Sequence, residues 1–264
     1  MECKRSIFVI SLVTDRFLLA HLHLEMLSEQ RSRRAVQTKA ENLPSGLYDT
    51  YDDVMERISQ QCRPNVDHAF KVLSWVTFAK RPLKPKELQY AVAITHGMTS
   101  VDDDDLTDVE DLLSFCAGIV IIDRESEVVR LVHYTTQGFL ENRLTDRKVD
   151  LARGCLSYLE VLRPPILHFL FEDCYPLFRY VGVYWADHIR GELEDQLKTD
   201  CLHAISGRWF QFLRGRGFSI PCFRIHELDV DFKVPLLLVF AAYGLAGFCR
   251  ELLGIGKYAP LKGS

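Results

Sequence analysis

The sequence predicts a mainly α-helical protein that contains a winged helix-turn-helix. Between residues 63 and 118, three stretches place apolar residues at helical spacing and are separated by prolines or polar loops. They are followed by "IVIID", the polar turn "RESE" and "VVRLVHY", a pattern that predicts a small β-hairpin. Three short helices followed by a hairpin are typical of a winged helix, which we predict over residues 66–145.

The first apolar stretch, "IFVISLV", follows two basic residues as in a signal peptide. Asp15 and Arg16 interrupt it, no small-residue cleavage site follows, and the stretch is too short to span a bilayer. We therefore expect residues 7–30 to form a buried amphipathic helix, and we expect no membrane partner. The basic stretch "RSRRAVQTKAEN" after it is predicted to be a polar linker.

One helix leads into the predicted winged helix, and the first helix of the winged helix follows it. After a Pro/Gly turn, the apolar residues at helical spacing are Leu47, Tyr51, Val54, Met55 and Ile58. The next helix is expected to begin near Pro64 and to end at Pro82, because proline cannot continue a helix. Its predicted core residues are Ala69, Val72, Leu73 and Val76.

Two more helices complete the helical part of the winged helix. Pro85 suits the first turn of a short helix, "PKELQYAVAI". After an acidic loop, Thr107 and Glu110 have the spacing of a capping box, in which each side chain bonds to an exposed amide of the helix start. The helix that they open is predicted to stop at Gly118.

More helices are predicted toward the C-terminus, in "LARGCLSYLEVL", "YPLFRYVGVYWADHIRG" and "GELEDQLKTDCLHAI", with Trp185 and Trp209 anchoring their packing. The stretch "PLLLVFAAYGLAGFCRELLGIG" predicts two short helices joined by a turn at Gly244. The spacing of an ankyrin repeat is present in Gly244, Phe248, Leu252 and Leu253. One repeat cannot bury its own faces, so a cut-off array is expected.

Composition argues against several function classes. The net charge is −4 and the pI about 6.1, so the basic footprint of a nucleic-acid-binding protein is missing. The eight cysteines are spread out with no CxxC pair, which predicts reduced thiols in a cytoplasmic protein and argues against a disulfide framework or a zinc site.

No catalytic or metal site is predicted. The phosphate-binding pattern G-x-x-x-x-G-K-[ST] is missing, since Tyr258 follows Gly256-Lys257. His226-Glu227 lacks the second histidine of a zincin helix, and the four aspartates of the acidic loop, Asp102–Asp105, lack the glycine and closing glutamate of a calcium loop. We therefore expect a chain that is not an enzyme and holds no cofactor.

A winged helix also suggests DNA binding, with its third helix in the major groove. Here that helix carries Asp108, Glu110 and Asp111, which would repel phosphates. Arg124 and Arg130 in the wing do not reverse the sign. DNA binding is therefore kept only as the less favoured alternative.

Six stretches occur in one order along the chain: "FLLAHLHLEML", "LPSGLYDTYDDVMERI", "VLSWVTFAKRPLKPKELQYAVAI", "DLLSFCAGIVIID", "VRLVHYTTQGFL" and "YPLFRYVGVYWADHIRG". Together they resemble the region between the NTPase and the ankyrin repeats of fungal NACHT–ankyrin proteins, over roughly residues 13–253. These are signal-transduction ATPases of the STAND class, related in plan to NOD-like receptors.

The resemblance implies four parts. They are the helical end of a NACHT module with a linker (1–42), a helical lead-in with the winged helix (43–145), a helical connector (146–230) and a partial ankyrin-like repeat with a tail (231–264). In the family, the NACHT domain binds ADP or ATP, the winged helix holds it in an inactive state, and the ankyrin array binds a protein. Because the phosphate-binding loop is missing, we expect a fragment or a decayed copy.

The same resemblance singles out His133 in "LVHYTTQGFL" as a group that reaches the diphosphate of ADP in an intact parent protein. A local capping role at the strand–helix junction is the alternative. The family often has an acidic or larger residue where Gly138 stands. The functions implied are a regulatory module that clamps a NACHT domain in cis or in trans, or a free-standing ankyrin-type scaffold that binds a protein.

Overall fold

The computed structural model describes residues 18–24, 26–28, 30–44, 46–98, 100–162, 175–206, 240–241 and 243–253. These residues are mostly helical, and their strands form a two-stranded antiparallel sheet, which confirms the predicted fold class. They divide into two compact units. The first lies within Met1–Leu88 and Thr107–Thr145, and the second within Gln89–Leu106 and Asp146–Ser264.

The N-terminal helix is confirmed where the structure describes it. Residues 18–24 and 26–28 are helical, and residues 1–17 lie outside the described part. Leu18, Leu22 and Met26 follow one another at intervals of one helical turn and are buried.

The predicted linker is wrong, because Arg33–Glu41 forms helix α2. The Ser32 hydroxyl accepts a hydrogen bond from the Ala35 amide at 3.2 Å and so caps the helix start. The helix consists largely of residues with high helix propensity, such as arginine, alanine, glutamine and lysine. None of its residues is buried, so no apolar periodicity marks it in the sequence.

Helix α3, Leu47–Ser59, follows the predicted pattern. Four of its five predicted apolar residues are buried, namely Tyr51, Val54, Met55 and Ile58, while Leu47 is half-buried. Thr50 is buried as well, and its hydroxyl is satisfied there by donating to the Gly46 carbonyl at 2.8 Å.

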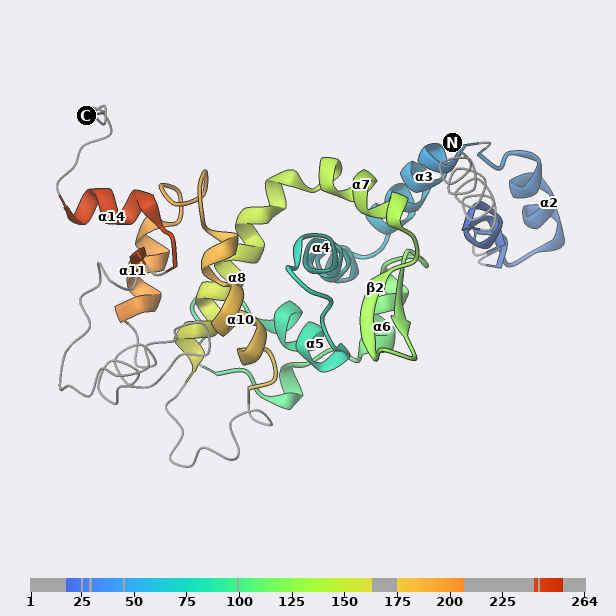
Figure 1. The fold of residues 1–264 in the computed structure, drawn as a ribbon. Helices are drawn as coiled ribbons and strands as arrows, with labels where there is room; N and C mark the ends of the chain where they lie inside the picture. Colours follow the sequence, from blue (N-terminus) through green and yellow to red (C-terminus); the bar gives the residue numbers. More distant parts are fainter. Residues whose placement is uncertain are drawn as a thin grey trace, which may run out of the picture. The chain divides into compact units, whose positions relative to one another are not determined.

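Helix α4, Arg63–Phe78, begins at the predicted place and buries Ala69, Val72 and Leu73. Val76 is only half-buried, and Trp75 and Thr77 are buried beside it. The difference arises because α4 packs against α3, α6, α7 and β2, so its buried surface is wider than one stripe. Figure 1 shows α4 nearly end-on, with α7 and β2 on two sides of it.

The end of α4 differs from the prediction. Ala79 leaves the helix with φ −59 and ψ 141, three residues before Pro82. The chain then bends at residues 80–81, and the Leu83 carbonyl accepts a hydrogen bond from the Val129 amide at 2.8 Å. Helix α5, Pro85–Ala93, then begins at the predicted proline.

The predicted capping box of Thr107 and Glu110 is wrong. A capping box is instead formed at the 3-10 helix η1, Asp103–Asp105, where the Asp105 carboxylate accepts from the Asp102 amide at 2.9 Å. Helix α6, Val109–Phe115, has Asp108 as its N-cap without a side-chain bond. Thr107 instead lies 3.4 Å from the His68 ring through its hydroxyl, so it is engaged with another helix.

The β-hairpin is confirmed. Strand β1, Val120–Asp123, pairs with β2, Val128–Leu131, in antiparallel register with Val120 opposite Leu131. The Asp123 carboxylate accepts from the amides of Glu125 and Ser126 and from the Arg130 side chain, at 3.0, 3.4 and 3.0 Å. These bonds lower the pKa of Asp123, the two amides contributing most, and hold the wing in one turn.

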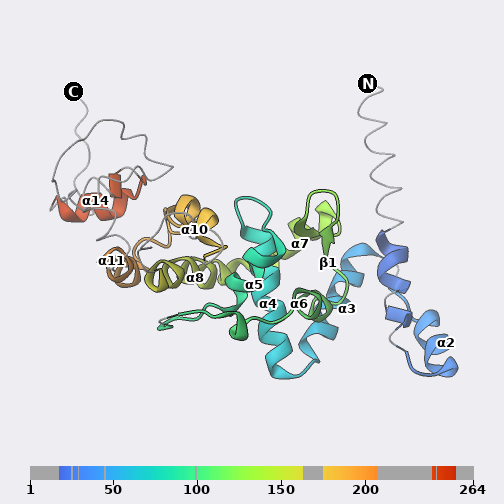
Figure 2. The same ribbon diagram turned by 90° about the horizontal axis from the view of Figure 1, so that it is seen from below.

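After β2 come α7, Tyr134–Arg143, and the short η2, Thr145–Arg147. In the second unit, α8 (Lys148–Val161) packs against α10 (Phe178–Tyr184), η4 (Ala186–His188) and α11 (Lys198–Ser206). Figure 2 shows α10 lying along α8.

Two of the predicted helices are shorter than expected. The helix predicted over 175–191 ends at Tyr184, and the one predicted from Gly191 starts only at Lys198. Gly191 has φ +93, and its amide donates to the Glu194 carboxylate at 3.0 Å, which favours a turn there. Trp185 is fully buried as predicted, and Trp209 lies outside the described residues.

The predicted turn at Gly244 is confirmed within the described residues 240–241 and 243–253. Gly244 has φ +68, and α14, Ala246–Leu252, follows it. Phe240 stacks on Phe248 with ring centroids 4.6 Å apart. That this pair belongs to an ankyrin array stays a prediction.

Candidate functional site

His133 lies where β2 ends and α7 begins. It is the N-cap of α7, with extended dihedrals of φ −152 and ψ 154. Its Nδ1 atom lies 2.8 Å from the Thr135 hydroxyl and accepts a longer hydrogen bond, 3.4 Å, from the Thr135 amide. The imidazole therefore performs the local capping role that we considered as the alternative, and it does so through Nδ1.

A chain of hydroxyl groups continues from Thr135 into the core. The Thr135 hydroxyl lies 2.8 Å from the Tyr51 hydroxyl, and the Thr136 hydroxyl donates to the same Tyr51 oxygen at 2.9 Å. Tyr51 is 1% exposed and Thr136 fully buried. The chain ties α7, which carries His133, to α3, which carries Tyr51.

Aromatic rings surround these hydroxyls. The ring centroids of Tyr51 and Phe139 are 5.1 Å apart, and Tyr48 packs on Phe139 at 6.1 Å. Next to His133, the Tyr134 ring is 4.3 Å away and its side chain is mostly exposed. The inner rings exclude water from the hydroxyl chain, while the imidazole stays at the edge of the core.

The electrostatics at this place favour an anion. The first turn of α7 has no acidic residue, and unsatisfied amides give a helix start a partial positive charge. Arg143 lies at the other end of α7 and pairs with Asp52 at 3.0 Å. An imidazole at such a start can bind a phosphate oxygen.

Sequence reasoning singled out His133 and missed its hydroxyl partners. Tyr51 has the spacing of a core residue, and Thr136 that of an ordinary residue in the first turn of a helix. The motif "HYTT" is the signal that could have indicated the threonines. No local signal points from it to Tyr51.

The third helix of the winged helix-turn-helix presents acidic side chains to solvent. Asp108, Glu110 and Asp111 are all exposed, whereas Leu112 and Cys116 are buried on the opposite side. The surface that would enter a DNA groove is therefore negatively charged, as the sequence predicts.

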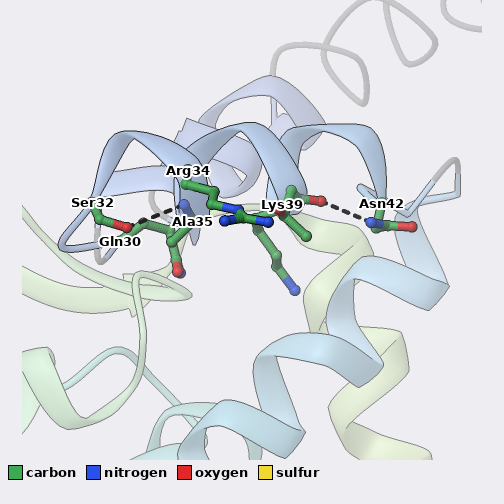
Figure 3. A pocket seen from close by; sticks show the side chains of 7 residues that line it. Gln30, Ser32, Arg34, Ala35, Lys39 and Asn42 are labelled. Atoms are coloured by element: carbon green, nitrogen blue, oxygen red, sulfur yellow. Dashed lines mark hydrogen bonds between the residues drawn. The ribbon is translucent and has the colours of Figure 1, made fainter.

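A hollow of about 550 Å³ lies along α2 (Figure 3). Its polar groups serve the helix itself: Ser32 caps Ala35, and Asn42 donates to the Thr38 carbonyl at 2.8 Å. Lys39 forms an ion pair with Asp53 at 3.3 Å. The hollow is open and its lining is engaged locally, so it has no arrangement of groups that indicates a ligand.

Three of the described thiols are buried and therefore unreactive, whereas Cys62 is exposed. Burial raises the pKa of Cys116 and Cys155 far above the usual thiol range and that of Cys201 to about 12. In the described part of the chain, no three His, Cys, Asp or Glu side chains gather as metal ligands would. Nor does that part contain a helix of the length and apolarity needed to cross a membrane.

Comparison with known protein families also identifies the winged helix. No curated protein matches the chain, and no solved structure matches it. Residues 55–153 match a family model described as the winged helix domain of GPI inositol-deacylase. The match starts within α3 and ends in α8. The helices and hairpin that carry His133 therefore form a winged helix domain similar to that of GPI inositol-deacylase.

Proposed function

We propose that this chain is a non-catalytic regulatory module whose winged helix packs against a NACHT nucleotide-binding domain, in the same polypeptide or in another one. The observation that carries the proposal is the position of His133, at the start of α7 and directly after the wing. The match of residues 55–153 to a winged helix domain model and the ordered motifs of the NACHT–ankyrin resemblance support it.

In this role His133 binds a phosphate and makes no covalent bond. Its ring and the amides at the start of α7 would meet the terminal phosphate of ADP. A hydrogen bond to an ionised phosphate contributes about 1.5–3 kcal/mol, more than one between neutral groups. A nucleotide whose phosphates lie elsewhere than those of ADP would lose this bond to His133. The winged helix would then be released from the NACHT domain.

The negative charge of α6 favours a protein partner over DNA. Its exposed residues Asp108, Glu110 and Asp111 suit a basic protein surface and oppose a phosphate backbone. This leaves the winged helix as an element that contacts protein.

The test adds the full chain to a NACHT domain from a protein that carries this kind of winged helix. Release of a fluorescent ADP analogue is then measured. We expect the chain to slow ADP release. With His133→Ala, ADP release should be roughly 10-fold or more faster than with the unchanged chain, which corresponds to the loss of one charge-assisted hydrogen bond. His21→Ala, at an exposed position on another helix, is the control. No slowing by the unchanged chain would refute the proposal.

A protein-binding scaffold is the second candidate function. It is favoured by the firm attachment of α14 and the turn before it, because Arg190 donates to the Tyr243 carbonyl at 2.7 Å and the Gly247 amide donates to Glu194 at 2.6 Å. A scaffold would capture its protein partner with equal affinity in the presence and absence of nucleotide. A regulatory clamp would show nucleotide-dependent affinity for the NACHT domain.

A further inference from the structure

We propose that Tyr51 is a positioning residue for His133. Through Thr135, its hydroxyl fixes the imidazole as the tautomer that carries its proton on Nε2. The chain of contacts is Thr136 to Tyr51 at 2.9 Å, Tyr51 to Thr135 at 2.8 Å, and Thr135 to His133 at 2.8 Å. That the proton on Nε2 binds a phosphate rests on the proposed function. That the proton is on Nε2 rests on the structure alone.

The directions follow from the Thr135 amide, which donates to Nδ1 of His133 and so requires a lone pair on that atom. The Thr135 hydroxyl then donates its one proton to the same nitrogen. With that proton used, the Thr135 oxygen accepts from the Tyr51 hydroxyl, whose own oxygen accepts from Thr136. The proton of the neutral ring is therefore on Nε2.

Burial makes this arrangement durable. Tyr51 is 1% exposed, Thr136 is fully buried, and the Phe139 ring lies 5.1 Å from that of Tyr51. Water therefore has little access to replace a lost partner, and removing one hydroxyl leaves the others without the bond they had. The order of donors is set from the core outward and ends at the imidazole.

The tautomer decides what His133 offers a ligand. A ring with its proton on Nε2 presents a donor, which suits a phosphate oxygen. The opposite tautomer would present a lone pair there and disfavour an anion. Tyr51 thus links α3 to the ligand chemistry of α7 without touching the ligand.

The test is nitrogen-15 NMR of the full chain labelled at histidine, recorded where His133 is neutral. The His133 signals are assigned by their loss in His133→Gln. We expect Nε2 at the upfield position of a protonated ring nitrogen and Nδ1 at the downfield position of an unprotonated one. In Tyr51→Phe the two resonances should move toward each other as both tautomers become populated. A wild-type proton on Nδ1, or an unchanged pair of resonances in Tyr51→Phe, would overturn the inference.

Two further variants keep the test decisive. Tyr48→Phe removes a hydroxyl from another tyrosine of α3 that packs on Phe139, and it should leave the His133 resonances in place. Thr136→Val removes the donor to Tyr51 with little change of shape, and should shift them as Tyr51→Phe does, even if the latter folds poorly. Because the readout needs no NACHT domain, expected resonances together with unchanged ADP release would refute the proposed function and leave this inference standing.

Discussion

Arg81 forms two parallel hydrogen bonds to Glu87, Nη1 to Oε2 at 2.8 Å and Nη2 to Oε1 at 2.6 Å. The side chain of Glu87 is 7% exposed and that of Arg81 33%. The same carboxylate accepts from the Lys84 amide at 2.8 Å, so it also caps the start of α5. One buried carboxylate thus fixes the corner between α4 and α5.

Arg81→Ala should therefore lower the free energy of unfolding by about 2 kcal/mol. It leaves a buried carboxylate without its cation, and the loss is smaller than for a fully buried pair because Arg81 is partly in water. Arg63→Ala is the matched control, since the pair of Arg63 with Asp67 is 88% and 60% exposed. Urea unfolding should show a change of less than about 0.5 kcal/mol for the control. Equal losses in the two variants would contradict this account.

Gly138→Ala should stabilise the protein. Gly138 lies inside α7, and an added Cβ would meet no atom within 4 Å. Alanine in a helix is favoured over glycine by about 0.5–1 kcal/mol when the site has room. Thermal unfolding should show a higher midpoint.

Gly247→Ala should have the opposite effect, although Gly247 is also in a helix, α14. A Cβ there would lie 2.5 Å from a Glu194 carboxylate oxygen, the same oxygen that accepts from the Gly247 amide. Displacing that carboxylate should cost about 1–3 kcal/mol, more than the gain in helix propensity. Faster proteolysis at α14 would report the loss, and two variants of equal stability would contradict the packing described.

The winged helix was predictable because its elements have strong and separate signals. Pro64 and Pro85 mark helix starts, and "RESE" lies between two apolar strands that pair as expected. Helix α2 was not predictable by the same means, because no residue in it is buried and periodicity therefore carries no information. Its signals are a capping serine and helix propensity, and a polar linker can contain both.

The site was predictable only in part, for a different reason. His133 is marked by a local motif, but the hydroxyl that positions it lies 84 residues away from Thr135 in the sequence. Likewise, Thr107 has the spacing of a capping residue and is engaged by His68, 39 residues before it. Local sequence patterns contain no information about partners that are distant in the sequence. They therefore identify His133 and miss the residues that hold it in place.

The acidic surface of α6 predicts that the wild-type chain shows no salt-dependent binding to duplex DNA. Replacing Asp108, Glu110 and Asp111 together by lysine should create such binding, because these exposed side chains lie where phosphates would approach. Fluorescence anisotropy with a labelled duplex at several salt concentrations measures both. Steeply salt-dependent binding by the wild-type chain would support the DNA-binding alternative.

His203 of α11 and Glu160 of α8 predict a pH dependence within the second unit. The imidazole Nδ1 lies 2.8 Å from the carboxylate, and that hydrogen bond, with the charge of Glu160, raises the pKa of His203. The folded state therefore favours the protonated ring. The stabilisation is complete below the ordinary histidine pKa of about 6.5 and is lost as pH rises through the higher pKa of the folded state.

In Glu160→Gln, the NMR titration of His203 should move to lower pH, and the fall in unfolding free energy over this interval should become shallower. Because His203 is 73% exposed, the difference should be small and should shrink further in high salt. An unchanged titration in Glu160→Gln would mean that the pair does not form in solution, and that α11 is held against α8 by its other contacts, among them the ion pair of Arg153 with Asp200 at 3.1 Å.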